Sequence, residues 1–302
     1  MEQSDNTSPC ARAGRSPARK YRILSFVGLG VFALLAVLLL ITLLMRRQEA
    51  AQSESLRELY YSHGGLEALS TAEPDPESGW EHGLTTVRPE DIPERFRELW
   101  EINRDLIGWI KAGELADEPV VYRDNEYYLS HSFRGADGGG GTVFADEENT
   151  GWPTDPYLIL YGHNIETGSM FGKLPKYCEL QTLKDNAVIE WDTIVSGHAE
   201  EYAVFSVFNA SMLPEDPDYF YLRRFDELRR GGPAEMKKLV DELCGRSLFD
   251  IPLEVTEDDR ILVLVTCSYK DPDGRLMVCC RALRSGETAD DISAVIAQSS
   301  VR

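Results

Sequence analysis

A cysteine and an arginine stand on either side of a predicted turn near the end of the chain. Residues 261–278, ILVLVTCSYKDPDGRLMV, form a β-type stretch that ends at Cys267, then a turn, then a second β-type stretch that begins at Arg275. The Pro-Asp-Gly sequence favours a type I turn, so we expect both side chains at the same end of an antiparallel hairpin. A cation lowers the pKa of a thiol, and an oxyanion needs a donor. The pair suits a cysteine nucleophile; the alternative is a buried strand cysteine and a surface arginine.

A histidine ends another strand-like segment. Residues 156–174, PYLILYGHNIETGSMFGKL, place His163 directly after an apolar run. A cysteine and a histidine from distant positions are the usual components of cysteine nucleophile catalysis, in which the imidazole moves protons. The other histidines lie in polar linker or loop sequences: His63, His82, His131 and His198. His163 is therefore the candidate acid and base.

Short strands are predicted to position these side chains. Many short strands at close spacing are typical of a β-barrel or sandwich, so we predict a mainly β domain with peripheral helices. Helices are expected from Pro93, with helical spacing as far as Ile107, and over 168–178 and 232–244. The β-type stretches cover 118–123, 141–146, 156–163, 187–192, 201–208, 253–258, 260–267 and 275–283.

An uncharged apolar segment precedes this domain. Residues 23–45 carry no charge, and as a helix of about 34 Å they are long enough to cross a bilayer. More basic residues precede the segment than follow it, which predicts a cytoplasmic N-terminus and an extracellular remainder. A cleaved signal peptide, with a cleavage site at 51–53, is the alternative. We expect a cytoplasmic stretch over 1–22, an extracellular linker over 46–88, and a catalytic domain over 89–302.

Charge and cysteine content limit the partners and cofactors. The net charge is −20, and residues 1–47 hold seven Lys/Arg against two acidic residues, so the rest of the chain carries −25. Such a domain should repel nucleic acid. No metal-ligand spacing occurs, and we predict neither a metal nor a cofactor. The cysteines after the apolar segment are odd in number, so at least one should lack an intramolecular partner: Cys178, Cys244, Cys267, Cys279 and Cys280.

Two of these sequences, in this order, resemble the motifs of class B sortases. YGHNIETGSMFGKLPKY is similar to the histidine motif of that family, and LVTCSYKDPDGRLMV is similar to its TLxTC motif. IGWIKAGELADEPVVYRDNEYYLSHSF and GGTVFADEEN resemble its opening strands, and GRSLFDIPLEVTEDDRILVLVTC resembles its approach to the cysteine. The resemblance covers residues 95–284. It implies an eight-stranded sortase-type β-barrel preceded by a single N-terminal transmembrane helix.

The resemblance also implies catalytic roles. Cys267 occupies the position of the nucleophile, His163 that of the catalytic histidine, and Arg275 that of the arginine that opens the strand after the cysteine loop. Arg281 lies on the same strand face and is the alternative arginine. It lies about 20 Å further along the strand, too far for both to serve one site.

A groove for a sorting signal is implied as well. Val265 stands where class B sortases commonly have serine, so we expect a lost hydroxyl contact and a different preferred peptide. Either Tyr219 or Tyr221 takes the family's tyrosine position, and the helix over 232–244 matches a helical insertion of this class. The positions matched to the groove are Asn125, Leu129, Val265, Thr266 and Ser268.

The implied activity is that of a membrane-anchored cysteine transpeptidase, working through a thioester acyl-enzyme. It would cleave the C-terminal sorting signal of secreted proteins at a threonine and join the acyl group to an amine of a peptidoglycan precursor or a pilin. The expected location is the cell membrane of a Gram-positive-type cell, spanned once, with the catalytic domain outside. The alternatives are an extracellular cysteine peptidase, in which water replaces the amine, and a non-enzymatic anchored binding module.

Overall fold

The computed structural model describes residues 17–65, 88–137, 140–195, 199–267 and 273–302. The chain divides into two compact units, Met1–Gln48 and Glu49–Arg302. Helix α1 (Pro17–Ser62) begins in the first unit and ends in the second. It contains a candidate membrane span within Gly28–Ser62, identified by length and apolar composition.

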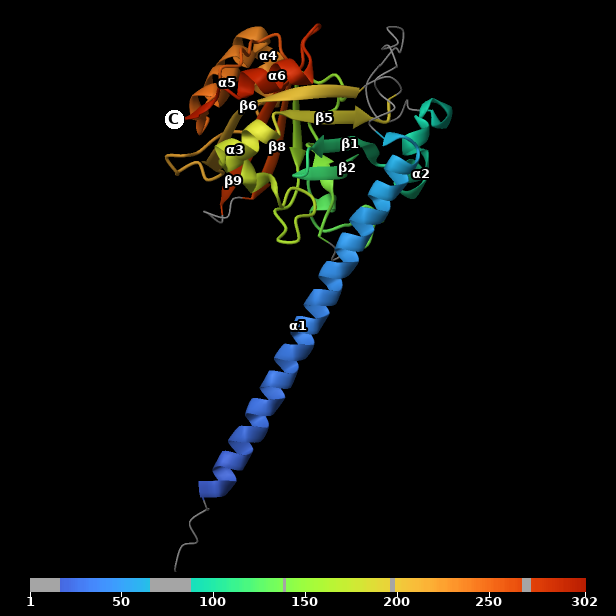
Figure 1. Cartoon of the computed structure of the whole chain (residues 1–302), viewed down its shortest axis with the longest axis vertical. Helices are drawn as coiled ribbons and strands as arrows, with labels where there is room; N and C mark the ends of the chain where they lie inside the picture. Colours follow the sequence, from blue (N-terminus) through green and yellow to red (C-terminus); the bar gives the residue numbers. More distant parts are fainter. Residues whose placement is uncertain (1–16, 66–87, 138–139, 196–198, 268–272) are drawn as a thin grey trace, which may run out of the picture. The chain divides into compact units, whose positions relative to one another are not determined.

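Eight strands of the second unit close into a barrel, in the order β1-β2-β3-β4-β8-β9-β6-β5 (Figure 1). The pairing of β1 with β5 completes the ring. The pairs β2–β3 and β4–β8 are parallel, and the others are antiparallel. The predicted mainly β, eight-stranded barrel is confirmed. Its strands are β1 (Leu106–Ala112), β2 (Ala116–Tyr122), β3 (Val143–Ala145), β4 (Tyr157–Tyr161), β5 (Val188–Thr193), β6 (Ala199–Ser211), β8 (Ile261–Cys267) and β9 (Gly274–Ala282).

One expected strand is absent, and another lies where a helix was expected to continue. The segment 253–258 forms no strand; in it the carbonyl oxygen of Glu254 accepts a hydrogen bond from the guanidinium of Arg281. Strand β1 takes the eighth place in the barrel. The preceding helix stops before it because Asn103 is extended and its side chain accepts a hydrogen bond from the amide of Asp105, a local bond that competes with the helix.

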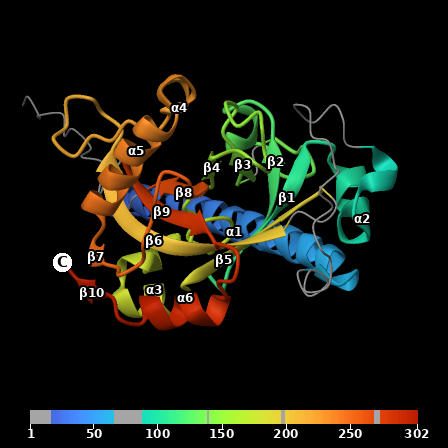
Figure 2. The same ribbon diagram turned by 90° about the horizontal axis from the view of Figure 1, so that it is seen from above.

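Helices surround the barrel. Where a helix was expected over 168–178, a series of turns leads into η5 (Leu174–Cys178), whereas the helix expected over 232–244 forms as α5 (Pro233–Arg246). We did not predict α6, although its capping box of Thr288 and Asp291 is visible in the sequence. Figure 2 shows α3 and α6 side by side near β5 and β6, and α4 beside α5. The remaining elements are η3 (Pro89–Asp91), α2 (Glu94–Ile102), η4 (Tyr127–Leu129), η5 (Leu174–Cys178), α3 (Leu180–Asp185), α4 (Phe225–Gly231), α5 (Pro233–Arg246), α6 (Ala289–Ile296) and the pair β7 (Phe249–Asp250) and β10 (Ser300–Val301).

The two faces of β8 belong to two apolar cores. Leu262 and Leu264 lie in the larger core, inside the barrel. Val263 and Val265 lie in a second core, which the residues of α4 and α5 cover on the outer face. Because side chains alternate along a strand, Cys267 continues the row of Val263 and Val265. The thiol therefore belongs to the outer face of the barrel.

Part of the expected linker belongs to the folded unit. Residues 49–62 form the end of α1, and Tyr60 is fully buried with its ring stacked on Trp109, the ring centroids 4.4 Å apart. The hydroxyl of Tyr60 donates to Asp192 at 2.6 Å, and Arg95 binds the same carboxylate with two hydrogen bonds. Residues 49–62 of the expected linker therefore belong to the folded unit, because this helix carries an apolar face that the barrel buries. Residues 66–87 of that linker lie outside the described part of the chain.

Candidate active site

The strand register brings Cys267 and Arg275 together. Cys267, the last residue of β8, pairs directly with Arg275 on β9, as the hairpin sequence predicted. Arg275 is partly exposed, and its Nη1 donates to the carbonyl oxygen of Gly274. Arg281 lies at the far end of β9, opposite Ile261, so it does not reach the thiol. The geometry thus favours Arg275 over Arg281 as the arginine of this site.

A parallel pairing brings the histidine to the same edge. Tyr161 at the end of β4 pairs with Val265, so β4 and β8 both end at this side of the barrel. His163 follows two residues after Tyr161 and is hydrogen bonded to the thiol of Cys267. Asn164 Nδ2 donates to the carbonyl oxygen of Cys267 at 2.8 Å. Side chains more than a hundred residues apart in sequence therefore meet because two neighbouring strands run in the same direction.

The electrostatics of the site favour a charged thiol and imidazole. The hydrogen bond from His163 lowers the pKa of Cys267, and the charge of Arg275 lowers it further, against the opposing effect of burial. The same hydrogen bond raises the pKa of His163. Burial instead raises the pKa of Cys244, and it raises the pKa of Cys279 well above its ordinary value. A lowered thiol pKa and partial exposure are the properties of a reactive cysteine.

A backbone carbonyl holds the imidazole. Nε2 of His163 lies 2.7 Å from the carbonyl oxygen of Leu129, and this contact also raises the pKa of His163. Gly141, with a φ of 85°, lies against the ring: a Cβ there would be 2.9 Å from His163 Cδ2 and 2.7 Å from the carbonyl oxygen of Tyr128. We did not predict either contact. The glycine run before residue 142 was visible only as a turn signal.

The positions matched to a peptide groove differ in their availability. The side chain of Leu129 is 47% exposed. The amide of Asn125 is already bonded within the protein, to the carboxylate of Asp146 and to the backbone amide of Glu147. Asn125 therefore holds the loop after β3 through these two bonds, whether or not it also contacts a substrate.

The alternation of β8 separates two further groove positions. Val265 lies on the outer face with Cys267, whereas Thr266 pairs with Leu276 of the inner core and is 2% exposed. The hydroxyl of Thr266 therefore does not face the thiol side of the strand, and it is buried without a hydrogen-bond partner. Ser268 lies outside the described residues. Tyr221 is exposed, whereas Tyr219 bridges to Ser211, and neither is singled out as the groove tyrosine.

A buried carboxylate beside this edge was missing from our predictions. Asp146 is fully buried, accepts a hydrogen bond from the hydroxyl of Tyr161 at 2.7 Å, and forms an ion pair with Arg223 at 2.9 Å. These bonds connect the segment before α4 to the loop after β3. The carboxylate is occupied by protein donors, and among the described residues no group of three or more His, Cys, Asp or Glu could hold a metal ion.

No family model matches the chain, but curated relatives do. Sortase B of Listeria monocytogenes is 27% identical over 193 residues, which cover 62% of this chain and 74% of that protein. Sortase B of Staphylococcus aureus is 26% identical over 205 residues, which cover 67% of this chain and 80% of that protein.

Solved sortase structures share the fold. Sortase B from B. anthracis in complex with AAEK1 matches with a TM-score of 0.61 and 22% identity, over 80% of this chain and 99% of that chain. The S. aureus sortase B–substrate complex matches with a TM-score of 0.59 and 23% identity, over 80% and 98%. Clostridium perfringens sortase B matches with a TM-score of 0.53 and 26% identity, over 62% and 99%.

The barrel and these relatives indicate the class of protein: the chain has the sortase fold and is similar to sortases in sequence. Within that family the matches support a class B sortase. The resemblance drawn from the histidine and cysteine motifs is thereby confirmed.

Proposed function

We propose that this protein is a membrane-anchored transpeptidase that cleaves a sorting signal at a threonine and transfers the acyl group to an amine. The observation that carries the proposal is the meeting of Cys267, His163 and Arg275 at one edge of the barrel, with the thiol hydrogen bonded to the imidazole. The sortase B relatives supply the reaction class.

In the proposed first half-reaction, the thiolate of Cys267 attacks the carbonyl carbon of the threonine. The oxyanion that forms receives hydrogen bonds from Arg275, whose guanidinium has donors beyond the one used by Gly274. The intermediate collapses, the carbon–nitrogen bond breaks, and His163 gives its proton to the leaving amine. A thioester between Cys267 and the threonine remains.

In the second half-reaction an incoming amine attacks the thioester carbon. His163, now neutral, takes the proton that the amine loses, and Cys267 leaves as a thiolate. The enzyme returns to its starting protonation state, and a new amide bond has formed. The raised pKa of His163 suits both steps, because the imidazolium must persist until the leaving amine needs its proton.

The groove and the anchor are part of the same proposal. Leu129 is exposed beside the catalytic pair and would contact the bound signal, whereas Val265 and Thr266 are 3% and 2% exposed and would contribute mainly through their backbone. The N-terminal helix would hold the catalytic domain outside the cell, with residues 1–22 in the cytoplasm and 23–45 in the membrane. Partners would be secreted proteins with a C-terminal sorting signal, and an amine of a peptidoglycan precursor or pilin.

The amine separates this proposal from a peptidase. The full-length protein in detergent is incubated with a peptide of the Asn-Pro-x-Thr kind, with and without triglycine or a lysine peptide, and the product masses are recorded. We expect slow cleavage alone and the amide product when the amine is present. Accumulation of the hydrolysis product alone, at saturating concentrations of several amines, would establish the peptidase instead. Absence of any covalent adduct at Cys267 would favour a binding module.

A further inference from the structure

A buried carboxylate joins the end of α1 to the loop that follows His163. Glu118 on β2 is 4% exposed, and its Oε1 accepts hydrogen bonds from Arg57 Nη2 at 2.8 Å and from the backbone amide of Met170 at 3.0 Å. Ser53 donates to the second oxygen at 3.3 Å. Burial raises the pKa of Glu118, and Arg57 and the Met170 amide oppose this rise. The charge is therefore compensated by partners from two other segments.

Met170 needs such an anchor. Among the described residues it is the only one other than glycine with a positive φ, at 50°. This left-handed conformation is unfavourable for a side chain of this kind, and it persists only where surrounding contacts enforce it. The side chain of Met170 is 5% exposed, and its amide is held by Glu118. The hydrogen bond that the Met170 amide donates to Glu118 is thus one of the contacts that enforce the backbone conformation at Met170.

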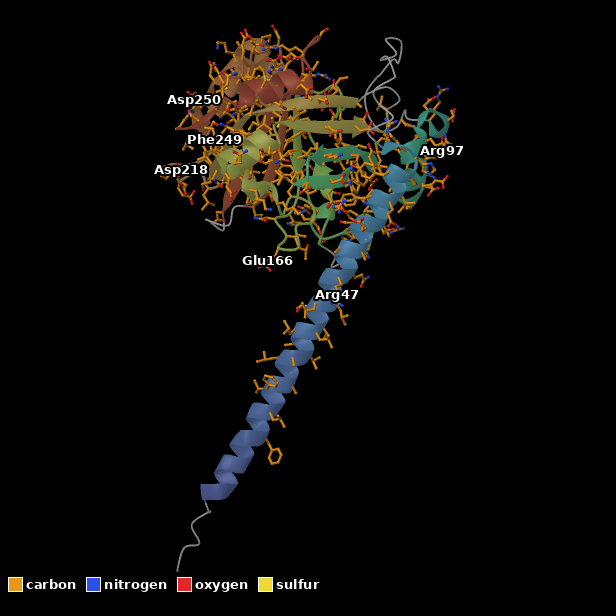
Figure 3. The ribbon with its side chains drawn as sticks, viewed as in Figure 1. Arg47, Arg97, Glu166, Asp218, Phe249 and Asp250 are labelled. Atoms are coloured by element: carbon orange, nitrogen blue, oxygen red, sulfur yellow. The ribbon has the colours of Figure 1, made fainter. Side chains whose placement is uncertain are left out.

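The anchored residue closes the histidine loop. Asn164 bridges to Met170, and the amide of Phe171 donates to the carbonyl oxygen of His163 at 3.2 Å. The side chain of Asn164 in turn binds the carbonyl oxygen of Cys267. The loop between these contacts reaches solvent at Glu166, which points away from the strands (Figure 3). Met170 therefore fixes the far end of this loop.

The surrounding protein leaves this loop room to shift. A cavity of about 60 Å³ lies between the end of α1 and the loop, and Ser53, Glu118, Gly141 and Met170 are among the residues that line it. Gly141 also touches the ring of His163. If the bond at Glu118 were lost, Met170 could relax into this space, and His163 would move with it.

We propose that Arg57 and Glu118 are positioning residues for the catalytic histidine. Their ion pair fixes Met170, and Met170 fixes the loop that holds His163 against Cys267. Neither residue touches the reacting atoms, and the inference rests on the proposed role of the cysteine–histidine pair. It also assigns a function to the end of α1, because Arg57 comes from that helix.

The test uses the full-length protein in detergent. It compares a variant that removes only the charge of Arg57 with a variant that removes the charges of both Arg57 and Glu118. Arg57→Met leaves the Glu118 carboxylate buried without its cation. Arg57→Met combined with Glu118→Gln leaves no charge at position 118, and the amide oxygen of glutamine can still accept from Met170; Asp117, which also pairs with Arg57 at 3.7 Å, loses this partner in both variants. Tyr60→Phe is the matched control, since it removes a hydrogen bond between the same helix and Asp192. The readouts are the alkylation rate of Cys267 at pH 7, followed by peptide mass, kcat and KM for the amide product, and thermal unfolding.

We expect Arg57→Met to slow alkylation of Cys267 and to lower kcat, each by about tenfold, the effect of losing one buried charged hydrogen bond. KM should change by less than about twofold, since the substrate groove is untouched. The double variant should recover most of both rates. Tyr60→Phe should lower the unfolding temperature without changing alkylation.

If Cys267 is alkylated as fast in Arg57→Met as in the wild type, the inference is overturned and the proposed function stands. Equal losses in Arg57→Met and Tyr60→Phe, or no recovery in the double variant, would also overturn it, because the effect would then be one of stability. A wild-type Cys267 no more reactive than Cys244 would remove the proposed function itself, and the inference with it.

Discussion

At one end of the β8–β9 hairpin Arg275 lies opposite Cys267, and at the other end Arg281 lies opposite Ile261. Arg281 is 1% exposed, donates twice to the carboxylate of Glu287 at 2.7 Å, and also binds backbone carbonyl oxygens. Arg275 is partly exposed and lowers the pKa of Cys267. A buried charge is stable only when its donors are satisfied by the protein, so Arg281 has little left for a ligand.

The thiols of the same hairpin show the same contrast. Cys267 has a cation and an imidazole beside it, and its pKa is lowered. Cys279 and Cys280 lie within the apolar cores, and burial raises the pKa of both. One end of the hairpin therefore carries a thiol with a lowered pKa, and the rest packs into the apolar cores. Variants at the two ends should separate these properties.

The largest effect is expected at the reactive thiol. Cys267→Ala should abolish the acyl-enzyme and the amide product while leaving the unfolding temperature close to that of the wild type, since the side chain is partly exposed. Trapping of the peptide adduct by mass spectrometry measures this. Cys244→Ala is the control and should keep the adduct. An adduct at Cys178, Cys244, Cys279 or Cys280 would contradict the assignment.

The next largest effect concerns the arginine at the reactive end. Arg275→Ala should lower kcat about 100- to 1000-fold, the usual result of removing one oxyanion donor, with little change in stability. Steady-state kinetics of the amide product, with and without the substitution, measure the effect. A fully active Arg275→Ala together with an inactive but folded Arg281→Ala would reverse the roles of the two ends.

The third largest effect is expected in the pH dependence of the alkylation rate of Cys267. Because the pKa of Cys267 is lowered, its thiolate persists below the ordinary value of 9.0 and is lost only as the pH falls through the lowered pKa. The alkylation rate of Cys267 should therefore reach half its maximum below pH 9.0. His163→Ala removes the largest cause of the shift, so this midpoint should rise. A midpoint that does not move in His163→Ala would show that the imidazole does not activate the thiol.

The smallest effect on activity is expected at the buried arginine. Arg281→Met should destabilise the protein by about 2 kcal/mol, because Glu287 loses its partner but remains partly hydrated. Arg281 lowers the pKa of Glu287, so this stabilisation is present above the ordinary carboxyl pKa and is lost as the pH falls through the lowered value. Urea unfolding at neutral and acid pH should show a difference that shrinks in acid. The folded fraction should keep kcat within about twofold of the wild type.

The sequence alone was sufficient for the features that depend on local pattern. The turn between β8 and β9 predicted that Cys267 would face Arg275, and the register has this pairing. The order of the histidine and cysteine motifs indicated a class B sortase. Alternation and turn residues indicated a mainly β domain, because the period of a strand is written in consecutive residues.

Tertiary structure decided the contacts between segments. Leu129 reaches His163 through its backbone carbonyl, which any residue type could provide, so no sequence signal marks it. The segment 253–258 has the composition of a strand, but within it the carbonyl oxygen of Glu254 accepts from the side chains of Arg281 and Arg284. Arg57 meets Glu118 only because the barrel buries the end of α1. Each of these contacts joins residues far apart in the chain, and closure of the barrel, rather than local preference, determines which of them meet.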